Sequence, residues 1–173
     1  MISSLFLGAA YLGLSLSAHV ITPTERELAM LDEVNYVRTN PIEYANYIES
    51  YTKFWESDRE ELAAAAELRK ELTSMKKVDS LKWSPILYHD AFTHGNYLKK
   101  TKKFEHSDYE WAENIVSGDE TVRFAIINLL IDSGIASRGH RKNLLNSNYT
   151  EFAVYEVPGL VGEWDFVFVQ EFN

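Results

Sequence analysis

The chain of 173 residues contains no cysteine, and this absence removes several kinds of chemistry. No thiol can act as a nucleophile and no disulfide can form, so packing of the core has to carry the stability. Basic residues are also few: 17 Lys and Arg stand against 26 Asp and Glu, for a formal net charge of -9. Because binding to nucleic acid depends on a basic surface that neutralises phosphates, nucleic acid is not an expected partner.

Several familiar catalytic motifs are absent as well. The sequence has no G-x-S-x-G, no P-loop, no H-E-x-x-H and no glycine fingerprint for dinucleotides. Its length and its hydrophobic content of 46% suit one domain with a single sizeable core. We therefore expect one domain over residues 24–173.

The first 18 residues are typical of an export signal. They carry no charged side chain, are mostly apolar or small, and end in Ser15-Leu16-Ser17-Ala18. The stretch is short for a membrane span. We predict a signal peptide over residues 1–18, a secreted or cell-surface protein, and no stable membrane span after cleavage. An uncleaved anchor and a buried N-terminal helix are the alternatives.

Start signals and apolar spacing predict several helices. Thr24 and Glu27 form a capping box, and the helix that follows ends near Thr39. Proline at a first helical position, where its missing N–H has no cost, predicts helices that start at Pro41 and Pro85. Further helices are expected at Ser57–Leu72 and Thr121–Asp132, with a short helical turn at Lys142–Leu145.

Strand signals come mostly late in the chain. Ala112–Val116 is a short candidate, while Glu151–Val157 and Trp164–Phe172 are rich in β-branched and aromatic residues on either side of the turn Pro158-Gly159. Two apolar strands need cover on both faces, and amphipathic helices are the available partners. The expected fold is α+β, a three-layer α-β-α sandwich with a central, mostly antiparallel sheet.

Two stretches hold the candidate site residues. FEHSDYEWAENI, residues 104–115, contains His106, Asp108, Glu110 and Glu113, and SRGHRKNLLN, residues 137–146, contains His140. Two imidazoles and one or two carboxylates suit a divalent transition metal such as zinc if folding brings them together. The alternative is that these are surface residues and that His140 only caps the short helical turn.

The same stretches carry a resemblance to a known family. Three segments resemble, in this order, signatures of the CAP superfamily, also called the SCP domain. They are His106-Ser107, Glu113-Asn114-Ile115, and Gly139-His140-Arg141-Lys142-Asn143-Leu144-Leu145-Asn146 with Tyr149-Thr150-Glu151. The members of the superfamily are the cysteine-rich secretory, antigen 5 and class-one pathogenesis-related proteins. Val34-Asn35-Tyr36-Val37-Arg38-Thr39-Asn40-Pro41 resembles its first helix, and Val169-Gln170-Glu171-Phe172 its final strand. The resemblance covers roughly residues 28–172.

The resemblance implies a cleft with two histidines and two acidic residues that can hold a divalent metal. By position these are His106, Glu113 and His140, and Asp132 stands near the fourth position, where the family has a glutamate. The possible metal ligands are His106, His140 and Glu113, and zinc is the possible ion. The ligands that the resemblance implies include sterols and other lipids, and the expected partner is an unknown small molecule, lipid or peptide. Without cysteine, the chain resembles the prokaryotic type of the family.

Three functions stay open at this point. The first is a secreted binding module with a metal-holding cleft. The second is a peptidase-like hydrolase in which His106 or His140 activates a water or Ser107, and Glu113 orients the histidine or acts as the base. The third is a structural domain with a vestigial cleft. His94 is expected to be a hydrogen-bonded core residue. If His140 is a cleft ligand, Arg138, Arg141 and Lys142 are expected near the cleft mouth, where they would keep His140 neutral and attract an anionic ligand. The alternative is that these basic residues belong to a solvated face.

Overall fold

A computed structural model describes residues 22–53, 58–117, 121–159 and 161–173 of the chain. The described part contains helices and strands in the order α1 (Glu25–Thr39), α2 (Pro41–Lys53), α3 (Arg59–Ser74), β1 (Lys82–Trp83), α4 (Pro85–Thr101), β2 (Ala112–Val116), α5 (Val122–Ile131), α6 (Gly139–Leu145), β3 (Glu151–Val157) and β4 (Val167–Phe172). The predicted signal peptide, residues 1–18, lies outside the described residues. No helix in the described ranges has both the length and the apolar character that a membrane crossing requires.

Side-chain caps fix where several helices begin. The predicted capping box is present at α1, because Thr24 Oγ1 accepts from the backbone N–H of Glu27 at 3.2 Å and the Glu27 carboxylate accepts from the backbone N–H of Thr24 at 2.7 Å. In α3 the cap is Asp58, which accepts from the backbone N–H of Glu61 at 2.9 Å, so this helix begins at Arg59. The helix predicted as a turn at Lys142–Leu145 begins earlier, at Gly139, and includes His140.

The four strands of the described part form one sheet in the order β1-β3-β4-β2. Both β2 and β3 pair antiparallel with β4, and only the short β1, which the sequence did not predict, pairs parallel with β3. The central, mostly antiparallel sheet is thus confirmed. Strand β4 begins at Val167 instead of Trp164, because the chain turns at Phe166, whose φ is 53°.

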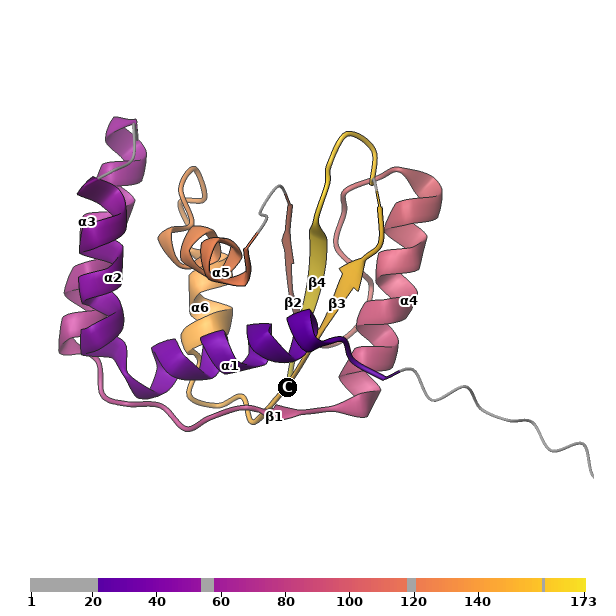
Figure 1. Ribbon diagram of the computed structural model, residues 1–173, viewed down its shortest axis with the longest axis horizontal. Coiled ribbons are helices and arrows are strands. Elements are labelled where there is room, and N and C mark those ends of the chain that lie inside the picture. Colours follow the sequence, from indigo (N-terminus) through magenta and orange to yellow (C-terminus); the bar gives the residue numbers. More distant parts are fainter. Residues whose placement is uncertain (1–21, 54–57, 118–120, 160) are drawn as a thin grey trace, which may run out of the picture.

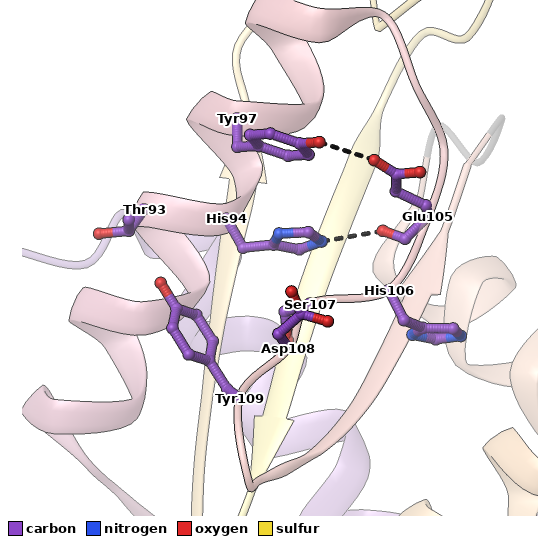
Figure 2. A pocket seen from close by; sticks show the side chains of 8 residues that line it. All are labelled: Thr93, His94, Tyr97, Glu105, His106, Ser107, Asp108 and Tyr109. Atoms are coloured by element: carbon purple, nitrogen blue, oxygen red, sulfur yellow. Dashed lines mark hydrogen bonds between the residues drawn. The ribbon is translucent and has the colours of Figure 1, made fainter.

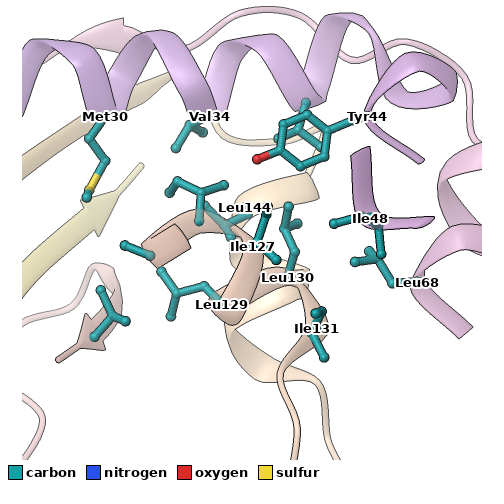
Figure 3. Close-up of a cluster of buried hydrophobic side chains, with 14 of the residues drawn as sticks. Met30, Val34, Tyr44, Ile48, Leu68, Ile127, Leu129, Leu130, Ile131 and Leu144 are labelled. Atoms are coloured by element: carbon teal, nitrogen blue, oxygen red, sulfur yellow. The ribbon is translucent and has the colours of Figure 1, made fainter. Parts of the chain in front are cut away.

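Helices cover both faces of the sheet, which confirms the sandwich (Figure 1). Ala153, Tyr155 and Val157 of β3 pack in one apolar cluster with Leu87, Ala91 and Leu98 of α4. Alternate residues of the same strand, Phe152 and Val154, pack in the larger cluster with α1, α2, α3, α5 and α6. Figure 3 shows part of this larger cluster, where Met30 and Val34 of α1 face Leu129 and Leu130 of α5. Period-two alternation of the strands therefore separates two cores.

One glycine allows α4 to lie close to the sheet. A Cβ atom on Gly95 would lie 2.6 Å from Tyr155 Cδ1 and 2.8 Å from Val157 Cγ2, well inside van der Waals contact. Neighbouring His94 is buried at the same contact between helix and sheet, with 6% of its surface exposed. The close approach of α4 thereby places an imidazole beside strand β2.

Candidate functional site

His106 and Glu113 form the first carboxylate–imidazole pair. Glu113 lies on β2 and His106 on the segment that leads into this strand, and His106 Nδ1 is 2.7 Å from Glu113 Oε1. The backbone N–H of Ser107 donates to the same oxygen at 3.0 Å. The Glu113 side chain is 4% exposed, whereas that of His106 is 61% exposed. The pair therefore combines a buried, anchored carboxylate with an imidazole that faces solvent.

These contacts shift the pKa values of both groups. Burial alone would raise the pKa of Glu113, but hydrogen bonds from His106 and from the Ser107 N–H, together with the two nearby imidazoles, hold it below its ordinary value. The hydrogen bond to Glu113 raises the pKa of His106, against the opposing effect of burial. Both shifts favour an imidazolium–carboxylate pair over a wider pH range than in free side chains.

The second carboxylate oxygen of Glu113 faces another histidine, His94 of α4. Its Oε2 lies 3.6 Å from His94 Nε2, and this nitrogen donates to the carbonyl oxygen of Glu105 at 2.9 Å. His94 is thus buried and hydrogen-bonded, as expected from the sequence, yet it also contacts the site. Glu171 is opposite Glu113 in the strand register. Among the described residues no N–H or other hydroxyl group donates to either of its oxygens or to Glu113 Oε2, so a proton held by Glu171 is shared with Glu113. Burial, and then the charge of Glu113, raises the pKa of Glu171 to about 9.

Asp132 and His140 form a second carboxylate–imidazole pair. Asp132 caps the C-terminus of α5 in the left-handed region, with φ 54° and ψ 44°, and its side chain is 2% exposed. Its Oδ1 lies 2.7 Å from His140 Nδ1, and its Oδ2 accepts from the backbone N–H of His140 at 3.0 Å. An acidic residue is unfavourable at this end of a helix, and the contact with His140 supplies the reason for its presence.

Side-chain amides connect the two pairs. Asn114, beside Glu113, donates to the carbonyl oxygen of His140 at 3.3 Å. Asn143, on the same helix as His140, donates to the carbonyl oxygen of Glu113 at 3.3 Å and to Asn114 Oδ1 at 2.9 Å. Strand β2 and helix α6 therefore lie against each other at the level of the site residues.

An open hollow of ≈ 520 Å³ adjoins the first pair on the side of α4. Figure 2 shows its lining: Thr93, His94 and Tyr97 come from α4, and Glu105, His106, Ser107, Asp108 and Tyr109 from the segment before β2. Of the four expected cleft residues, His106 lines this hollow, while Glu113, Asp132 and His140 are not in its lining. The imidazole of His106 points away from the other labelled side chains (Figure 2).

Arg138 and Arg141 have a structural role instead of the expected one at the mouth of a cleft, whereas Lys142 is exposed. Arg141 is 1% exposed and donates to Glu67 at 2.8 Å, to Glu71 at 3.2 Å and to three backbone carbonyls. Arg138 pairs with Glu60 and Glu67 of α3. Both guanidinium groups pair with carboxylates of α3, so they join this helix to the segment around His140.

Two further observations concern a serine nucleophile and a metal site. The Ser107 contact with Glu113 runs through its backbone N–H, and no hydrogen bond joins its hydroxyl to an imidazole in the parts of the chain that the structure describes. In the same ranges there is no group of three or more His, Asp or Glu side chains arranged to hold a metal ion. The observed arrangement is two separate pairs that are connected by the side-chain amides of Asn114 and Asn143.

Comparison with known families supports the resemblance seen in the sequence. Residues 31–172 match the CAP family, described as the Cysteine-rich secretory protein family. The chain belongs to this family. A comparison with proteins of curated function gave no match. The CAP match spans every site residue described above, from His94 on α4 to Glu171 on β4.

Some residues of this CAP domain's site were not predicted from the sequence. Glu171 was quoted only as part of a strand, and Asn114 and Asn143 only as parts of motifs. For Glu171 a signal was available: with Gln170 it interrupts an apolar strand, and it stands on the same face of the strand as Val169 and Val167, at i−2 and i−4, which are buried. The amide contacts depend on how β2 meets α6, and no local pattern carries that information.

Proposed function

We propose that this CAP-domain protein is a secreted binding module that holds a divalent metal such as zinc between His106 and His140, beside a site for a small or extended ligand. One observation carries the proposal: each imidazole presents its Nδ1 to a carboxylate that is at least nine-tenths buried. A carboxylate that orients an imidazole in this way is the usual outer partner of a metal-binding histidine.

The tautomers follow from the hydrogen bonds. An ionised carboxylate only accepts, so Nδ1 of His106 and of His140 carries the proton in the neutral imidazole. The lone pair is then on Nε2, the nitrogen that a metal would bind. On this proposal Glu113 orients His106 instead of serving as a ligand, and Asp132 does the same for His140. Water or a bound ligand would supply the other positions of a tetrahedral zinc ion.

The hollow beside His106 is the proposed site for the ligand. Its volume of ≈ 520 Å³ is in the range of ligand sites in proteins, about 300–1,000 Å³. Tyr97 and Tyr109, which are 42% and 39% exposed, offer ring surface, and Glu105 and Asp108 offer carboxylates. A molecule with both apolar and hydrogen-bonding parts, such as a sterol, another polar lipid or a peptide, suits this lining better than a bare acyl chain.

The proposal of export has two supports. Residues 1–18 have the composition of a signal peptide, and the family that the chain matches is described as secretory. Mass spectrometry of the protein recovered from the medium of an expressing cell tests it: the expected N-terminus lies near His19. Retention of the full-length chain inside the cell would contradict export.

Zinc titration of the purified domain tests the metal site. Zinc is expected to raise the melting temperature, because an ion that binds only the folded form stabilises it by mass action, whereas Ca²⁺, which prefers oxygen ligands, is expected to have little effect. His106→Ala and His140→Ala should each remove most of the zinc increment. His89→Ala is the matched control, since this histidine of α4 is exposed and outside the site. No zinc increment in the wild type, or a full increment in His140→Ala, would rule the site out.

A further inference from the structure

Two asparagines form a reciprocal contact between the elements that carry the site. Each follows a site residue closely in the chain, Asn114 directly after Glu113 and Asn143 three residues after His140. Each donates from Nδ2 to the backbone of the other element: Asn114 to the carbonyl oxygen of His140, and Asn143 to that of Glu113, both at 3.3 Å. The two amides also bond to each other at 2.9 Å. The backbone beside each functional side chain is therefore held from the opposite side.

The contact is anchored in the core. Asn114 is fully buried and also donates to Gln170 Oε1 of β4 at 3.1 Å, and Gln170 is its partner in the strand register. Gln170 in turn donates to the sulfur of Met30 in α1 at 3.2 Å. Every polar atom of the Asn114 side chain has a partner, so rotation of this amide would leave buried polar groups unpaired, which is unfavourable.

Neither carboxylate–imidazole pair fixes its position relative to the other. Glu113 and His106 are both attached to β2 and the segment before it, and Asp132 and His140 both belong to the α5–α6 corner. Within the described residues β2 is an edge strand, because its single strand partner is β4. The hydrogen bonds found between β2 and α6 in the described residues are those of the two asparagines. They are the polar contacts able to set the separation of the pairs.

We propose that Asn114 and Asn143 are positioning residues that set the spacing between the His106–Glu113 pair and the Asp132–His140 pair. The effect of this spacing on metal binding rests on the proposed function, whereas the spacing itself can be measured without metal. Because a metal bound by two imidazoles requires their nitrogens at a fixed separation, looser spacing weakens binding without removing any ligand.

Spacing is measured in the metal-free protein. The chain has no cysteine, so Glu110→Cys and Lys142→Cys, both at exposed positions, allow spin labels before β2 and on α6 without any background labelling. The distance distribution between the labels is compared in the otherwise wild-type chain, in Asn143→Ala and in Asn143→Asp, which keeps the size of the side chain but has no donor. We expect one narrow distance in the first and a broadened or shifted distribution in both Asn143 variants.

Asn35→Ala is the matched control. Asn35 is half-buried like Asn143 and exchanges two hydrogen bonds with the backbone of Leu81, at 2.7 and 3.0 Å, far from the site in the chain. It should lower stability by a similar route and leave the distance between the labels unchanged. Zinc affinity, measured by competition with a chelator, should fall about 10–100-fold in Asn143→Ala and remain unchanged in Asn35→Ala.

The outcomes separate the two proposals. A broadened distance in the Asn143 variants alone supports the positioning role, and the accompanying loss of zinc affinity links this role to the site. A broadened distance in a protein whose wild type binds no zinc supports the spacing role and overturns the proposed metal function. An unchanged distance in both Asn143 variants, or the same change in Asn35→Ala, overturns the positioning role.

Discussion

Glu113 and Glu171 face each other directly on the neighbouring antiparallel strands β2 and β4, with 4% of the Glu113 side chain and none of Glu171 exposed. Like charges at such a position repel, and burial removes the water that would screen them. The His106 and Ser107 contacts keep Glu113 ionised, so Glu171 is the partner that retains a proton. The site thus includes one ionised and one neutral carboxyl group.

Glu171→Gln should stabilise the domain at and above neutral pH. The pKa of Glu171 rises from 4.5 to about 9 on folding, so the folded state retains a proton that the unfolded state has lost. This group therefore costs stability increasingly as pH rises from about 4.5 towards 9. A glutamine has no such cost and can donate its N–H toward Glu113 Oε2. The expected gain is ~1–3 kcal/mol at pH 8 and near zero at pH 4, measured by urea unfolding.

The exposed Glu163 provides a control for this prediction. Glu163→Gln makes the same chemical change at the surface and should alter stability by less than about 0.5 kcal/mol at either pH. A Glu171→Gln domain that is less stable than the wild type at pH 8 would contradict the assignment of a neutral Glu171.

Gly95→Ala should destabilise the domain although alanine is the better helix former. The added Cβ would approach Tyr155 and Val157 of β3 to less than 3.0 Å, so α4 has to move away from the sheet. We expect a net loss of ~1–3 kcal/mol by denaturant unfolding, more than the gain in helix propensity. Gly139→Ala, whose Cβ would meet only Ser137 Oγ at 3.6 Å, should be neutral or slightly stabilising. Equal effects of the two substitutions would contradict this account of how α4 packs.

Local chemistry accounts for the parts of the fold that the sequence predicted. The Thr24 and Glu27 cap, the prolines at the starts of α2 and α4 and the alternation of β3 each depend on residues close together in the chain. Strand β1 has no such signal, since Lys82 and Trp83 are a strand only because they pair with Glu151 and Phe152 of β3. A two-residue strand is defined by its partner, which lies far away in the sequence.

The candidate site was likewise predicted from the sequence only in part. Its histidines and acids stand in recognisable motifs, so His106, Glu113, His140 and Asp132 could be named from the sequence, but the expectation that Arg138 and Arg141 lie at a cleft mouth was wrong. Both reach α3, which is 60 or more residues earlier in the chain, and charge alone does not show which glutamate an arginine will meet. The contact of His94 with Glu113 depends on the packing of α4, and was likewise beyond local patterns.

The contribution of the His106–Glu113 pair to stability should depend on pH. Folding raises the pKa of His106, so the imidazolium form of His106 stabilises the fold below about pH 6.5. This stabilisation is lost as the pH rises through the pKa that His106 has in the folded state. At the acid end it is lost as pH falls below about 4.5 through the lowered pKa of Glu113. His106→Ala should therefore lower the melting temperature by ~2 °C at pH 5.5 and by less at pH 8.5. A larger loss of melting temperature at pH 8.5 than at pH 5.5 would contradict the conclusion that the pair stabilises the fold mainly when His106 is protonated.

The last prediction separates ligands from the groups that orient them. If the metal binds Nε2 of both imidazoles, then Asp132→Asn and Glu113→Gln leave both ligands in place and should weaken zinc binding by about 10–100-fold, whereas His106→Ala and His140→Ala should nearly abolish it. A carboxamide can present either its oxygen or its N–H₂ group to Nδ1, so the imidazole loses both its fixed tautomer and the basicity that an anion provides. Isothermal titration with zinc at pH 7.5 measures the affinities of the four variants.

His94→Ala is an informative comparison, because His94 lies 3.6 Å from Glu113 Oε2 but donates Nε2–H to the carbonyl oxygen of Glu105. It should lower stability through lost packing and change zinc affinity less than either carboxylate variant. Abolition of binding by Glu113→Gln, as complete as that by His106→Ala, would make Glu113 a ligand and return the site to one built from two imidazoles and a carboxylate.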